Sequence, residues 1–80
     1  MNHVAVDLGS RKSQYCVRSA DGQVLQEAKV QTRALKGFFA QLEKSRVVLE
    51  TCSEAFTVAE YASAAGHEVS VVPATLAPSL

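Results

Sequence analysis

The spacing of hydrophobic residues changes once along these 80 residues, and that change limits the fold more than any other feature. In the first part of the chain the apolar residues alternate or form short runs, which is typical of β-strands. The predicted strands are His3–Leu8, Gln14–Ser19 and Val24–Val30. The connections Gly9–Ser13 and Ala20–Gln23, the second built on Asp-Gly, are too short for a crossover, so we expect an antiparallel meander.

After this meander, helical spacing alternates with short apolar strands. The first predicted helix runs from Arg33 to Lys44, with Thr32 as its N-cap. Four apolar residues at positions i, i+3, i+4 and i+7 form its buried stripe, namely Leu35, Phe38, Phe39 and Leu42.

A strand at Arg46–Glu50 follows, and a second helix is predicted at Glu54–Ala65. Thr51 or Ser53 would cap the start of that helix, and its buried stripe consists of Ala55, Val58, Ala59, Ala62 and Ala65. Gly66 ends the helix, and a last strand is expected at Glu68–Val72.

The order β-β-β-α-β-α-β predicts an α/β fold. Helical crossovers make the last strands parallel to the first, and such crossovers are right-handed. The simplest result is a ribonuclease H-like mixed five-stranded sheet of order 3-2-1-4-5, with helices between the later strands. The segment Pro73–Leu80 has no periodicity, and we expect it to begin a connection to further chain.

Composition excludes several classes of protein. Eight Lys and Arg residues balance eight Asp and Glu residues, which argues against a polybasic arm that binds nucleic acid by bulk charge. No apolar run approaches the roughly 18 residues of a membrane span. Asp7 interrupts the apolar start of the chain, which argues against a signal peptide, and two scattered cysteines suggest reduced thiols. We therefore expect a cytoplasmic location without membrane contact.

Asp7 and Glu50 are the strongest candidate site residues. Each follows a short apolar run, and in the predicted sheet the two strands are parallel neighbours about 4.8 Å apart. Two carboxylates that close repel each other unless a cation lies between them, and Mg²⁺ is the most plausible one, with Mn²⁺ as a substitute. The alternatives are that Asp7 only caps the following turn and that Glu50 only faces solvent.

Ser10, Arg11 and Lys12 follow Asp7 directly and could meet the phosphates of a nucleic acid. The alternative is an ordinary polar turn. The remaining acids are expected to be solvated surface groups; they are Asp21, Glu27, Glu43, Glu54, Glu60 and Glu68. His3 and His67 have no second ligand at metal spacing, so both are expected to be structural.

Three stretches of the chain resemble the N-terminal part of IS110/IS1111-family transposases. Val4–Lys12 is similar to the opening strand of that family, and Val47–Ser53 is similar to its strand that ends in Glu. Ala59–Ala74 resembles its helix-strand passage around Ala-Gly-His. The residues Cys52 and Ser53, and the lack of Asn before Pro73, depart from the family pattern.

The resemblance implies that residues 1–80 are the truncated N-terminal part of a RuvC-like domain with an Asp-Glu-Asp-Asp metal site. Asp7 and Glu50 would be its first two acids, and the other two would lie beyond Leu80. The full-length bacterial protein would then be a DNA transposase that cleaves and transfers DNA strands with Mg²⁺. Family members act as oligomers, and some use a structured guide RNA.

Two other functions fit the same residues. Asp7-Leu8-Gly9-Ser10 also resembles the first phosphate loop of the sugar kinase, actin and Hsp70 superfamily, in which the chain would be an ATP-binding fragment. The second Asp-x-Gly loop and the Gly-Gly adenosine motif of that superfamily do not occur in this sequence. A non-catalytic assembly module with the ribonuclease H-like fold is the third possibility, since fold does not fix function.

Overall fold

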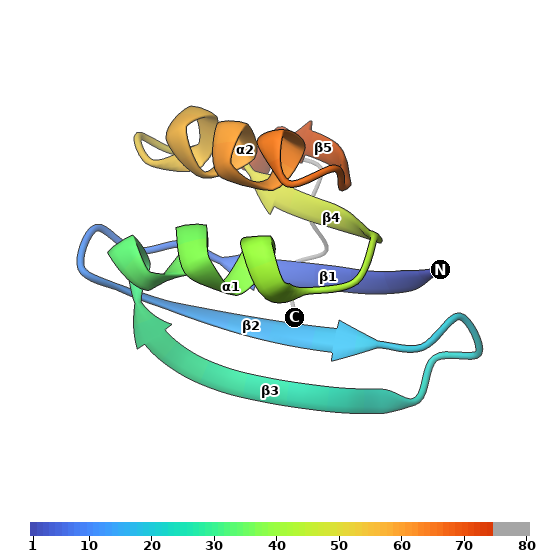
Figure 1. Cartoon of the computed structure of the whole chain (residues 1–80). Coiled ribbons are helices and arrows are strands. Elements are labelled where there is room, and N and C mark those ends of the chain that lie inside the picture. The colour runs from blue at the N-terminus through green and yellow to red at the C-terminus, as the bar shows by residue number, and fades with distance from the viewer. Residues whose placement is uncertain (75–80) are drawn as a thin grey trace.

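The computed structural model describes residues 1–74, and both of its helices lie on one face of a mixed β-sheet (Figure 1). The strands are β1 (Asn2–Asp7), β2 (Lys12–Arg18), β3 (Val24–Gln31), β4 (Ser45–Glu50) and β5 (Glu68–Val72). The helical elements are a 3₁₀ turn η1 (Thr32–Ala34) and the helices α1 (Leu35–Gln41) and α2 (Ala55–Ala64).

The five strands lie in the order β3-β2-β1-β4-β5, as the sequence predicted. The central strand β1 pairs antiparallel with β2 and parallel with β4. The antiparallel partner follows a short turn, whereas the parallel partner follows α1, because a parallel connection must cross back over the sheet. The prediction of a mixed five-stranded α/β sheet is thus confirmed.

The core lies between the helices and one face of the sheet. Alternate residues of the strands point into it, among them Val4 and Val6 of β1, and both are almost fully buried. Leu35 and Phe39 of α1 and Val58 of α2 cover them from the other side and are buried as well. Within residues 1–74 no helix covers the opposite face of the sheet, and the other alternate residues of β1 and β4 are exposed.

The first helix is shorter than predicted and is not capped by Thr32. It begins as η1, and no side-chain cap bond is present, because the Thr32 hydroxyl donates to the Gly9 carbonyl instead (2.6 Å). It ends at Gln41, since Leu42 is already extended and the chain must turn into β4. The predicted continuation to Lys44 is therefore wrong.

The second helix begins without the predicted side-chain cap. Neither candidate occupies the N-cap position, which belongs to Glu54. Thr51 donates its hydroxyl to the Val72 carbonyl at the end of β5 (3.1 Å), and Ser53 bonds the Glu54 carboxylate (2.7 Å). The predicted end of the helix is correct, because Gly66 has a φ of 94°, a conformation that glycine adopts without steric cost.

The β2–β3 connection is the predicted Asp-Gly hairpin. Gly22 has a φ of 90° and donates its N–H to the Ser19 carbonyl (2.9 Å). The Ser19 hydroxyl donates to the exposed Asp21 carboxylate, and this bond holds the Asp21 pKa below its ordinary value.

His67 is a buried structural residue, as expected. Its Nδ1 accepts the backbone N–H of Ser45 at the start of β4 (3.1 Å), and its Nε2 lies 2.8 Å from the Phe39 carbonyl oxygen. Because a carbonyl only accepts, Nε2 carries the proton. That carbonyl belongs to the last turn of α1, where helical partners are missing, so His67 joins α1 to the sheet.

Among residues 1–74, no helix is long and apolar enough to cross a bilayer. The expected connection at Pro73–Leu80 lies, beyond Ala74, outside the described residues.

Replacing His67 with Phe should leave two buried backbone groups without partners. We expect His67→Phe to lower the free energy of unfolding by about 1–3 kcal/mol, as measured by urea denaturation. His3 is exposed on β1 and provides a matched control, for which His3→Phe should change stability by less than about 0.5 kcal/mol. Equal effects of the two substitutions would contradict the structural role of His67.

Candidate functional site

The ends of β1 and β4 bring the two predicted acids to one place. In the parallel register Val6 lies opposite Leu49, so the next residues, Asp7 and Glu50, lie opposite each other. Both are exposed, and alternation places both side chains on the face of the sheet opposite α1 and α2. The predicted adjacency of the two strand ends is confirmed, whereas a role in metal binding stays a prediction.

The acid pair alone would supply two protein ligands to a metal ion. Within residues 1–74, no group of three or more His, Cys, Asp or Glu side chains is arranged to hold a metal. Mg²⁺ is commonly bound by one or two carboxylates together with water and substrate phosphates. Asp7 and Glu50 therefore fit Mg²⁺ that arrives with a phosphate ligand better than a closed metal site made of protein side chains.

The turn between β1 and β2 needs glycine at position 9. A Cβ atom on Gly9 would lie far inside the contact distance of the Lys12 carbonyl oxygen, which belongs to the fixed start of β2. The chain at Gly9 therefore approaches the Lys12 carbonyl so closely that only a residue without a Cβ atom fits at position 9.

Two hydroxyls hold this turn from beneath, and one of them belongs to Thr32, which was predicted to cap a helix instead. Ser13 Oγ accepts the Gly9 N–H (3.2 Å), and Thr32 Oγ1 donates to the Gly9 carbonyl (2.6 Å). The two oxygens are 2.7 Å apart and share a hydrogen bond, and both residues are buried. Since Thr32 donates to Gly9, Ser13 must donate to Thr32, so the direction of each bond is fixed. Ser10, the next residue of the turn, is exposed.

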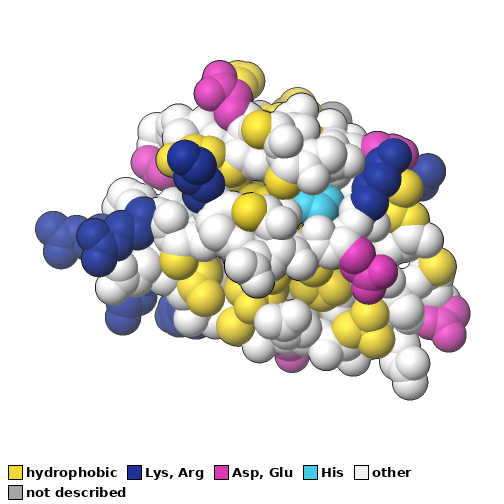
Figure 2. Space-filling model, in the orientation of Figure 1, with side chains coloured by type: hydrophobic (Ala, Val, Ile, Leu, Met, Phe, Trp, Pro, Cys, Tyr) yellow, Lys and Arg dark blue, Asp and Glu magenta, His cyan; other side chains and the backbone are white. Residues whose placement is uncertain are grey.

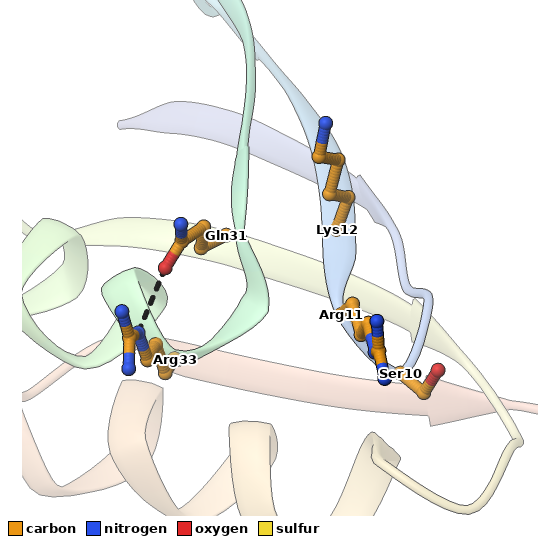
Figure 3. A pocket seen from close by; sticks show the side chains of 5 residues that line it. All are labelled: Ser10, Arg11, Lys12, Gln31 and Arg33. Carbon is orange, nitrogen blue, oxygen red and sulfur yellow. Dashed lines mark hydrogen bonds between the residues drawn. The ribbon is translucent and has the colours of Figure 1, made fainter.

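The three predicted phosphate-contact residues line one pocket of about 360 Å³ (Figure 3). Ser10 and Arg11 lie on one side of it, and Gln31 and Arg33, from the end of β3 and from η1, lie on the other. Lys12 completes the lining. Arg33 was not among the predicted phosphate-contact residues, and only the tertiary fold brings it to the same pocket as Arg11, 22 positions earlier in the sequence.

A second hollow of about 290 Å³ adjoins the first and shares Ser10 and Arg33 with it. Its other lining residues come mainly from the start of α2, and most of them carry hydroxyls; they are Thr32, Ser53, Glu54, Thr57, Val58 and Tyr61. Polar side chains thus surround the β1–β2 turn on the helical side of the sheet as well.

Comparison with known proteins finds similarity among solved structures. No model of a protein family matches the chain, and no curated protein matches it. The crystal structure of the type II variant of the Aquifex aeolicus Ppx/GppA phosphatase is similar, with a TM-score of 0.51 at 14% sequence identity. The match covers 92% of this chain and 36% of the phosphatase, so the chain spans about a third of that protein's length.

At this identity the likeness shows the fold alone. The phosphatase has the actin, sugar kinase and Hsp70-like fold, and the general α/β fold of residues 1–74 is similar to part of it.

The resemblance to IS110 transposases is wrong. The structural neighbour is a phosphatase of the actin-like fold, and no family match supports a RuvC-like transposase domain. The reason for the error is that the short stretch around Asp7-Leu8-Gly9-Ser10 resembles the start of both groups. The predicted roles in transposition and DNA recombination rested on this resemblance and are therefore wrong as well. Contact with DNA, a guide RNA or a second copy is not tested by the fold.

Two glycines allow a matched test of the turn. Gly9→Ala should destabilise the protein by at least about 2 kcal/mol, because the added Cβ collides with backbone that cannot move away. Gly37→Ala, in the middle of α1, adds a Cβ with nothing within 4 Å and should stabilise the helix by about 0.5–1 kcal/mol. Thermal unfolding of both variants measures the difference, and a Gly9→Ala protein as stable as the original would refute the constraint.

Proposed function

We propose that this chain binds the phosphate groups of ATP, together with Mg²⁺, as the first phosphate-loop portion of a protein of the sugar kinase, actin and Hsp70 superfamily. The observation that carries the proposal is the constrained Asp7-Leu8-Gly9-Ser10 turn, which lies beside Glu50 at the end of the sheet. Likeness to the fold of a phosphatase, an enzyme that acts on phosphoryl groups, supports it.

The arrangement of charge on the open face supports the same function. The acids Asp7 and Glu50 lie on the adjacent strands β1 and β4, and on the next two strands, β2 and β3, Lys12 pairs with Gln31. A phosphate ligand with Mg²⁺ requires this combination, since the acids hold the metal while the cations neutralise phosphate oxygens. When bound, Mg²⁺ would stabilise the negative charge that develops on a transferring phosphoryl group.

The role proposed for these residues is limited to phosphate and metal. Asp7 and Glu50 would bind the metal, and the exposed Ser10 would meet phosphate oxygens. Ser13 and Thr32 would act beneath the turn by fixing the position of Gly9. The adenosine motif of the superfamily does not occur in the 80 residues, so no adenosine contact is proposed for them.

Paramagnetic Mn²⁺ tests the metal site directly. We expect Mn²⁺ to broaden the backbone amide NMR signals around Asp7 and Glu50 at concentrations that leave β3 unaffected. Asp7→Asn and Glu50→Gln should each reduce this broadening strongly, because each removes a charged oxygen ligand. Glu27→Gln, an exposed acid on β3, is the control and should change nothing. Broadening that is spread evenly over all exposed carboxylates would disprove the site.

Inorganic triphosphate and adenosine separate phosphate recognition from base recognition. In the presence of Mg²⁺, triphosphate should shift the amide signals of Gly9–Lys12, whereas adenosine alone should shift none of them. Asp7→Asn should weaken the triphosphate effect about tenfold or more, since charge-assisted contacts contribute roughly 1.5–3 kcal/mol each. A response to adenosine without a response to triphosphate would contradict the proposed function.

A further inference from the structure

The basic pocket lined by Ser10, Arg11, Lys12, Gln31 and Arg33 is not explained by metal binding at Asp7 and Glu50. Three of its five lining residues are cationic, and none is acidic, in a chain whose net charge is +0. In the described part of the chain no carboxylate lies within ion-pair distance of these cations; the ion pair found there joins Arg46 to Glu68. Their charge is thus uncompensated by the protein.

The surface view shows the same asymmetry. Lys and Arg side chains gather at the end of the molecule that carries the β1–β2 turn, on the left of Figure 2. Most of the Asp and Glu side chains seen in this view lie along the top and at the opposite end. Like charges repel when they are held together, so this grouping favours an anion between them.

On one side of the pocket, the side chains of Arg33 and Gln31 are already joined by a hydrogen bond before any ligand binds. The Nε of Arg33 donates to Gln31 Oε1 at 2.7 Å, as the dashed line in Figure 3 shows. This bond fixes the guanidinium plane while leaving its two Nη groups for a ligand, and Gln31 keeps its amide N–H donors. A guanidinium held in this way can donate two parallel hydrogen bonds to a phosphate group.

We infer that this pocket is an oxyanion subsite in which Gln31 and Arg33 extend the phosphate contacts proposed for Ser10 and Lys12. The inference rests on the proposed function for its ligand class. The acids belong to β1 and β4, whereas Lys12 belongs to β2, which pairs with β1, and Gln31 belongs to β3. The pocket therefore lies on the side of β1 away from Glu50, and its ligand carries a phosphoryl group.

Inorganic phosphate without metal probes the pocket independently of the acids. In an NMR titration at constant ionic strength, we expect phosphate to shift the amide signals of Arg11, Gln31 and Arg33 and to saturate. Arg33→Gln should weaken this binding about five- to tenfold, because a charge-assisted contact is lost. Lys44→Gln removes one exposed cation away from the pocket and should leave the affinity unchanged.

The outcomes distinguish this inference from the proposed function. Shifts that do not saturate, or equal affinity in Arg33→Gln and the original chain, would overturn the oxyanion subsite while leaving Mn²⁺ binding at Asp7 intact. Failure of Mn²⁺ to bind at Asp7 and Glu50 would instead overturn the metal site, even if phosphate still titrates the pocket.

Discussion

The pairing of β1 with two different partners is the constraint on which the rest of the structure depends. Because β1 lies between β2 and β4, its side chains alternate between the two faces of the sheet, one covered by the helices and one open. Val4 and Val6 enter the core beneath the helices, and Asp7 must then lie on the open face. The parallel pairing with β4 places Glu50 beside it. A change of register by one residue would bury the acids and expose the core, so the fold and the candidate site are specified together.

The buried hydroxyls beneath the β1–β2 turn connect that pairing to the first helix. Thr32 donates its hydroxyl hydrogen bond to the Gly9 carbonyl, 23 residues earlier, and therefore does not cap the helix that begins beside it. The helix starts as a 3₁₀ turn, and Arg33 is brought to the basic pocket at the end of the sheet. A stable turn and an available cation are thus consequences of one hydrogen-bond network, in which each hydroxyl has its partner.

Much of the fold could be predicted because its signals are local. The alternation of Tyr15 and Val17, the Asp-Gly turn at Gly22 and the helix end at Gly66 depend on neighbouring residues only, and all three are confirmed. The helix caps were predicted wrongly for the opposite reason. Thr32 and Thr51 are common cap residues, yet each bonds a backbone group that is distant in sequence, and such a competition is decided by tertiary contacts.

The sequence by itself determined the order of the elements, the sheet topology and the pair of acids at two neighbouring strand ends, because short-range sterics and hydrophobic spacing act within a few residues. It could not separate two groups of proteins that share this architecture, since each places an acid after its first strand. Only the tertiary structure decided that Ser13 and Thr32 hold the turn and that Arg11 and Arg33 line one pocket. The residues of each pair are about 20 positions apart in the sequence, and only the completed sheet brings them close together.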